Sequence, residues 1–293
     1  MTAWSRVPLP HGLWRDGERQ SDAELRPLAG ADEAFLLEAG NGLSRAETVS
    51  LLLSRCVRRI GGIEAARIDD IRDLTVGDRE ALLLHLRRLS FGERISSVTR
   101  CPAPDCDEPM DLELEVRDLL LEPKEPSAAP VGESRLDIAG DATWTVSYRA
   151  VTGADQEAIA RRTRSGIEDA VQVLLDRCVL GITDITGAPI PTGNAMGLLR
   201  NRLPQLLSDH DPQAEIRLSL RCPVCEHAFE SIFDTASYLI AELSARGRTI
   251  FEEVHLIARR YHWSEEEILS LGVGRRRRYL ALIHDEISAE ARA

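Results

Sequence analysis

The sequence predicts an α+β protein that is mainly α-helical: an internally duplicated helical domain with a zinc-ribbon-like pair of β-hairpins and a helical C-terminal segment. Three observations predict this class. Apolar residues recur at helical spacing in several long segments. The string SRAETVSLLLSRCV, which begins at Ser44, returns from Ser165 as SGIEDAVQVLLDRCV with one gap. Two close pairs of cysteines each lie between stretches that read as strands.

Residues 1–43 contain many prolines and glycines, which predicts an extended arm with one short helix near Asp32–Ala39. Ser44 and Glu47 then have the spacing of a capping box, in which each side chain accepts a hydrogen bond from the other residue's free backbone N–H group. Apolar residues at helical spacing follow, so a helix is expected to begin here. A second helix is expected from Thr75 to about Leu89.

Strands are expected on both sides of each cysteine pair. The expected segments in the first half are Ile95–Thr99 and Met110–Val116, and those in the second half are Glu215–Leu220 and a strand through Phe229 and Ile232. A further hairpin is expected from Arg135–Ile138 and Thr143–Arg149, with its turn at Gly140 and Asp141. Helices are expected at 167–178, at 194–207 and from about residue 235 onward.

A stretch rich in proline, alanine and serine separates the two halves. The predicted parts are an extended N-terminal arm (1–43), a first repeat with a zinc knuckle (44–121), a linker (122–134), a second repeat with a zinc knuckle (135–234) and a helical C-terminal segment (235–293). Cys56 and Cys101 are 45 residues apart, and Cys178 and Cys222 are 44 apart. Nearly equal offsets across unrelated loops indicate a duplication in which each copy supplies one cysteine-bearing hairpin.

Four cysteines are the candidate metal ligands: Cys101, Cys106, Cys222 and Cys225. Zinc takes four ligands in a tetrahedron and binds thiolates well, and two cysteine turns from two hairpins supply four. Because protein atoms would fill every position, the Zn²⁺ is expected to be structural. The alternatives are four buried free thiols, a cysteine turn that has lost its metal-binding role, or competition by His227 as a ligand. Cys56 and Cys178 are interpreted as small core residues on apolar helix faces.

Composition narrows the function classes. The net charge of −12 argues against a protein that binds nucleic acid or an anionic membrane through its overall field. There is no apolar run long enough for a transmembrane helix, and the N-terminus lacks the pattern of a signal peptide. No phosphate-binding loop, nucleophile elbow or zinc-protease motif is present. An enzyme, and with it a small-molecule substrate, is therefore the least favoured class.

The C-terminal segment carries four consecutive cations followed by an aromatic residue: Arg275, Arg276, Arg277, Arg278 and Tyr279. On an acidic chain this dense positive spot is predicted to bind a partner, either an acidic surface of another protein or the chain's own acidic face. A solvated surface is the alternative. The order helix, short turn, helix, basic helix also allows a second reading: a zinc-ribbon regulator that binds nucleic acid through a helix-turn-helix-like segment.

Several strings resemble one family: RLSFGERISSVTRCPAPDCDEPMDLELEV, TGADQEA, LRCPVCEHAFESIFDTASYLIAEL and EVHLIARRYHWSEEEILSLGVGRRRRYLALI. They resemble the T-even-type phage baseplate protein family, with relatives in contractile injection systems, over roughly residues 74–120 and 145–285. The resemblance leaves the arm before residue 44 uncovered. It implies a structural or assembly component of the baseplate of a contractile tail. The implied partners are other baseplate, hub or tube proteins, and the implied location is the cytoplasm of the producing cell, before any incorporation into the assembled particle.

Overall fold

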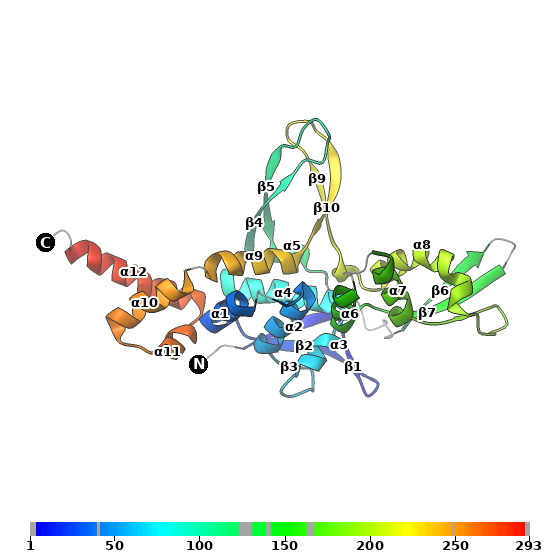
Figure 1. Ribbon diagram of the computed structural model, residues 1–293, viewed down its shortest axis with the longest axis horizontal. Helices are drawn as coiled ribbons and strands as arrows, with labels where there is room; N and C mark the ends of the chain where they lie inside the picture. Colours follow the sequence, from blue (N-terminus) through cyan, green and yellow to red (C-terminus); the bar gives the residue numbers. More distant parts are fainter. Residues whose placement is uncertain are drawn as a thin grey trace.

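The computed structural model describes residues 4–39, 42–122, 131–138, 142–162, 167–247 and 249–290. In these residues helices predominate, and the strands form four small antiparallel sheets, two of three strands and two of two. Figure 1 shows an elongated molecule with a stalk of two hairpins standing on a helical body. The mixed α and β composition agrees with the predicted class.

The first sheet, in the order β1-β2-β3, joins β1 (Ser5–Arg15), β2 (Glu18–Leu25) and β3 (Val57–Ile60). The N-terminal segment was predicted to be an extended arm, and here the structure differs. Residues 5–25 form an antiparallel hairpin in which Leu9 and Leu25 are fully buried. The N-terminal segment is therefore part of the main hydrophobic core.

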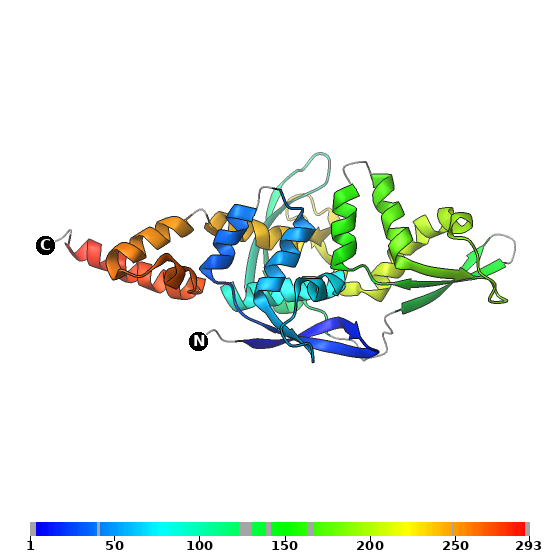
Figure 2. The same cartoon turned by 60° about the horizontal axis from the view of Figure 1, so that its bottom comes forward.

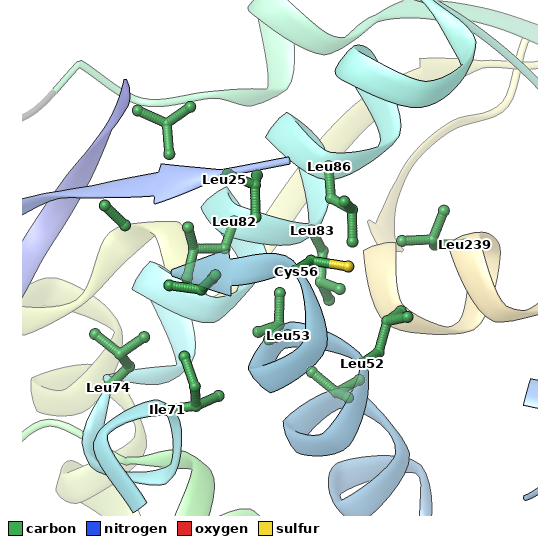
Figure 3. Packing of buried hydrophobic residues seen from close by; sticks show 14 of the residues in the cluster. Leu25, Leu52, Leu53, Cys56, Ile71, Leu74, Leu82, Leu83, Leu86 and Leu239 are labelled. Atoms are coloured by element: carbon green, nitrogen blue, oxygen red, sulfur yellow. The ribbon is translucent and has the colours of Figure 1, made fainter. Parts of the chain in front are cut away.

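Four helices precede the stalk in the first half: α1 (Gly30–Ala39), α2 (Arg45–Cys56), α3 (Ile68–Asp73) and α4 (Val76–Phe91). The capping box at the start of α2 is confirmed, because the Ser44 hydroxyl accepts from the N–H of Glu47 at 3.3 Å and the Glu47 carboxylate accepts from the N–H of Ser44 at 2.9 Å. Figure 3 shows the Cys56 side chain among the leucines of α2, α4 and α9. The core position predicted for Cys56 is confirmed by its full burial.

The second half has a similar order of elements. It contains β6 (Val131–Ile138), β7 (Ala142–Arg149), α6 (Gly153–Arg162), α7 (Ile167–Cys178), β8 (Val179–Thr183), α8 (Thr192–His210) and the short 3-10 helix η2 (Pro212–Ala214). The predicted hairpin is present, with Ile138 opposite Ala142, although its turn at Gly140 and Asp141 lies outside the described residues. Ser165, where the repeated string begins, also lies outside them. A separate core holds this half together around Val146, Leu175 and Leu199.

Each half contributes one hairpin to the stalk. The first consists of β4 (Arg94–Arg100) and β5 (Pro109–Glu115), followed by α5 (Val116–Leu119). The second consists of β9 (Ile216–Arg221) and β10 (Ala228–Phe233), followed by α9 (Thr235–Gly247), which returns to pack on α1 and α4. A small core that includes Ile95, Val116 and Phe233 joins the hairpins at their base. The two hairpins stand beside each other (Figure 1).

The C-terminal helices α10 (Ile250–Tyr261), α11 (Glu265–Leu269) and α12 (Val273–Glu290) pack around Ile257, Ile268 and Ile283. Figure 2 shows them at one end of the molecule, with β6 and β7 at the other. Within the described parts of the chain, none of the helices has the length and apolar character needed to cross a membrane.

Candidate metal centre

The four predicted ligand cysteines lie together at the tip of the stalk. Their sulfur atoms all fall within 4.8 Å of one another, although the two pairs come from different halves of the chain. Cys101 Sγ lies 3.6 Å from Cys225 Sγ, and Cys106 Sγ lies 3.7 Å from Cys222 Sγ. Thiolates at about 2.3 Å from one tetrahedral ion would be separated by roughly 3.8 Å. The four thiols could therefore hold a metal ion.

The two cysteine turns share one backbone design in spite of their different lengths. The first cysteine of each pair donates its N–H across the hairpin, Cys101 to the Glu108 carbonyl at 3.0 Å and Cys222 to the His227 carbonyl at 2.9 Å. The residue after the second cysteine is left-handed in both turns, with φ of 47° at Asp107 and 59° at Glu226. The extra residues of the first loop form a turn closed by the N–H of Cys106, which donates to the Ala103 carbonyl. The longer loop thus leaves the ligand geometry intact.

The centre is partly shielded from solvent. Cys101 and Cys222 are buried, Cys106 is half-buried and Cys225 is exposed. Met110, Leu220 and Phe229 pack around the two buried thiols. His227 is not part of the ligand cluster, and its ring stacks on Phe229 at 6.1 Å. Among the described residues, the cluster that could hold a metal consists of the four thiols alone.

The surroundings of Cys222 and Cys106 shift the pKa values of these two thiols in opposite directions. The backbone N–H groups of Cys225 and Val224 lower the pKa of Cys222 to about 7, because they donate to its sulfur. The backbone at Glu108 lowers the pKa of Cys106, but burial and the neighbouring thiols outweigh this and raise it to about 12. Several thiolates cannot accumulate here unless a cation compensates their charge, which is the environment that a metal ion provides.

Arg100 and Arg221 precede the two cysteine turns, and each forms hydrogen bonds to its own turn. The Arg100 guanidinium donates to the Asp107 carbonyl at 3.0 Å and pairs with the Asp107 carboxylate at 3.1 Å. Arg221 donates to the Glu226 carbonyl at 3.4 Å. Each arginine therefore holds the left-handed residue that follows the second cysteine of its pair.

The four arginines at the start of α12 differ in their exposure to solvent. Arg275, Arg277 and Arg278 are exposed. Arg276 is 1% exposed and does not face a partner protein: its guanidinium binds Glu33 at 2.6 Å and Glu253 at 2.9 Å. Of the two options predicted for the arginine run, the assignment of Arg276 to a partner protein is corrected, and the chain's own acidic residues take its place. Arg276 docks the C-terminal helices onto α1, the chain's own acidic face.

Tyr279, the last residue of the predicted partner site, is half-buried. Its ring packs edge-on against Trp263 at 4.9 Å and against Tyr261 at 5.4 Å. This aromatic cluster stabilises the C-terminal helices, so most of the ring is already engaged within the chain.

Two buried carboxylates, Asp32 and Asp155, were missed at the level of sequence. Arg26 donates two hydrogen bonds to the Asp32 carboxylate, of 2.6 and 3.1 Å. Arg149 likewise donates two to the Asp155 carboxylate, of 2.6 and 3.0 Å. A second arginine from the end of the following helix completes each site, Arg55 for Asp32 and Arg177 for Asp155. The string Gly-Ala-Asp, which occurs at residues 30–32 and again at 153–155, is the signal that could have found them.

Two hairpins on a helical body thus bring together four thiols that could hold a metal ion. Residues 16–138 match the family model described as T4 bacteriophage base plate protein. This match confirms the resemblance to the T4-type phage baseplate family over that part of the chain. It includes most of the N-terminal segment, which the resemblance had left uncovered, and it ends before the second cysteine pair. No curated protein and no solved structure matches the chain.

Proposed function

We propose that this chain is a structural or assembly component of the baseplate of a phage-tail-like contractile injection system. The observation that carries the proposal is the family match over residues 16–138, which runs from the first hairpin through β6. The proposed role is not enzymatic. It places the protein in the cytoplasm of the producing cell, where particles assemble, and then in the assembled particle.

The metal proposed for the tip is Zn²⁺ in a structural site. Support comes from the four-thiol donor set, from the sulfur separations of 3.6 and 3.7 Å, and from the absence of any other ligand in the cluster of described residues. Four protein ligands leave zinc no open position for water or substrate. Bound zinc would supply a cross-link, and Cys101, Cys106, Cys222 and Cys225 would hold it.

The proposed origin of the two hairpins is an internal duplication. The matching element order supports it, and the matching atoms around Asp32 and Asp155 support it further. In both sites the same carboxylate oxygen, Oδ2, accepts from a backbone N–H at 2.9 Å, from Ala29 in one and from Thr152 in the other. Two unrelated segments are not expected to have the same two arginines, the same backbone donor and the same hydrogen-bond pattern around one carboxylate.

The proposed partners are other baseplate, hub or tube proteins. Arg275, Arg277 and Arg278 are exposed at the start of α12. Positive charge at the beginning of a helix is unfavourable by several tenths of a kcal/mol for each residue. An acidic partner surface would remove this penalty and would pair well with guanidinium groups.

The test is a gene deletion in the native system, complemented with the wild-type chain or with Cys222→Ser/Cys225→Ser. Electron microscopy of the products should show intact contractile particles only with the wild-type gene, and the purified particles or their assembly intermediates should contain the chain. Normal particle yield in the deletion strain would contradict the proposal.

A regulator that binds nucleic acid through α12 is the second candidate, favoured only by the three exposed arginines. The net charge of −12 opposes it, because phosphates are repelled by the overall field. Fluorescence anisotropy with duplex DNA at physiological salt separates the candidates, since a regulator should bind tightly and a baseplate component should not.

A further inference from the structure

A groove of about 490 Å³ lies where the base of the first stalk hairpin meets α9. Three arginines line it, Arg87 from α4, Arg94 from β4 and Arg246 from α9. The lining contains one acidic residue, Glu242. This excess of positive charge is unusual on a chain whose net charge is −12.

The charges in the groove do not balance. Glu242 is shared by two cations, because its carboxylate lies 3.4 Å from Arg87 and 3.0 Å from Arg246. Arg94 is exposed, and its guanidinium forms no hydrogen bond or ion pair with any residue that the structure describes. Glu115 stands opposite Arg94 in the hairpin register but is held by Arg117 at 2.6 Å. The lining therefore carries two more positive charges than negative charges.

The groove is held in shape before any partner binds. The Arg246 guanidinium stacks over the Phe91 ring at 4.3 Å, and Arg87, which is 5% exposed, donates to the Gly92 carbonyl at 2.6 Å. Nη1 of Arg246 is buried and finds no acceptor within the described residues, which leaves the loss of its hydration uncompensated. A preorganised site with an unsatisfied donor favours binding, because little side-chain freedom remains to be lost.

We propose that this groove binds a carboxylate-bearing segment of a partner protein, with Arg94 facing the incoming carboxylate. Guanidinium groups pair with carboxylates through two parallel hydrogen bonds, and Glu242 already shows that Arg87 and Arg246 accept this chemistry. A nucleic acid fits less well, because a continuous run of phosphates would extend beyond the groove over a chain of net charge −12, whereas a protein segment can place single carboxylates in the groove. The inference does not depend on the baseplate role, since it concerns only the charge of the bound segment.

The test measures binding of a fluorescent peptide of alternating glutamate and alanine to the purified full chain at low ionic strength. The wild-type chain should bind it, with affinity that falls as salt is added. Arg94→Glu should weaken binding by roughly five-fold or more, because it replaces an attraction with a repulsion. Arg202→Glu on α8 is the matched control: it makes the same charge change at an exposed site in the other half, and it should leave binding unchanged.

Two further probes sharpen the result. The same peptide with glutamine in place of glutamate should not bind, and a single-stranded oligothymidylate should bind no better than the glutamine peptide. Equal peptide binding by wild type and Arg94→Glu would overturn the proposal, as would oligothymidylate binding that Arg94→Glu abolishes. Should Arg94→Glu lower the melting temperature, Arg94→Gln serves as the variant, with a smaller loss of affinity expected.

Discussion

The backbone N–H of Gly77 donates a hydrogen bond of 2.8 Å to the carboxylate of Asp211, a residue 134 positions further along the chain. This contact joins the start of α4 in the first half to the end of α8 in the second. The approach is so close that a Cβ atom at residue 77 would lie 1.9 Å from Asp211 Oδ1.

Gly77→Ala should therefore destabilise the protein, although alanine is the better helix former. The methyl group would push the Asp211 carboxylate away and break a buried hydrogen bond, at a cost of about 2 kcal/mol in the free energy of unfolding. Urea denaturation measures it. Gly197→Ala on α8 is the control: nothing lies within 4 Å of its Cβ position, so it should stabilise by up to about 1 kcal/mol. Equal effects of the two substitutions would argue against the contact.

Elemental analysis of the purified chain should find about one zinc per molecule. Cys222→Ser/Cys225→Ser should release the metal and lower the melting temperature, because the two stalk hairpins lose their cross-link. Ser219→Ala, an exposed change on the same hairpin, should retain both metal and stability. A metal-free wild-type protein whose melting temperature equals that of the double variant would refute the zinc site.

Asp155 should contribute to stability in a pH-dependent way. Burial raises its pKa, but hydrogen bonds from Arg149, Thr152 and Arg177 outweigh burial and lower the pKa to about 2, from an ordinary value of 3.8. A lowered pKa in the folded state means that the contribution is complete above about pH 4 and is lost as the pH falls toward 2, a change of about 2 kcal/mol.

Asp155→Asn should accordingly destabilise the protein at neutral pH by roughly 3 kcal/mol, since two arginines lose a buried partner. It should also flatten the pH dependence between 4 and 2 in chemical denaturation. Asp69→Asn removes an exposed carboxylate that pairs with Arg72, so its effect should stay below about 1 kcal/mol. Similar losses in both variants would show that burial does not set the energy of these pairs.

Arg276→Ala should loosen the C-terminal helices from the body. Removing this cation leaves Glu33 buried without a partner, which costs about 3–5 kcal/mol. Hydrogen exchange should speed up over α10 to α12 before it changes in the main core. Arg277→Ala, the exposed neighbour, should alter exchange little. Unchanged protection of α12 in Arg276→Ala would mean that other contacts hold these helices.

Features encoded by neighbouring residues were predicted well. The Ser44 capping box and α4 depend on side chains within one or two turns, and both are present as expected. The thiol cluster was predicted despite a separation of more than a hundred residues. The chain has six cysteines, and four of them fall in two close pairs, so residue type was the signal here and not closeness in sequence.

Other features that depend on distant partners were not predicted. Pro8 and Pro10 contributed to the prediction of an extended arm, but β1 lies at the edge of its sheet, where a residue without an N–H group is tolerated. The four consecutive arginines were predicted to form one binding surface. The periodicity of α12 instead buries Arg276 alone and leaves the other three exposed. Glu33, the partner of Arg276, lies 243 positions earlier, and no local pattern reveals such a pair.

A metal ion at the stalk tip would also change how the molecule carries load. Cys101 and Cys225 are 124 residues apart, and the hairpins that bear them leave the body at different places. A pull applied at the tip would be divided among four strands and delivered to both halves at once. Because the metal would link the two hairpins at their tips, neither hairpin could separate from the other there. The stalk would then resist force as one unit attached to the body at two places.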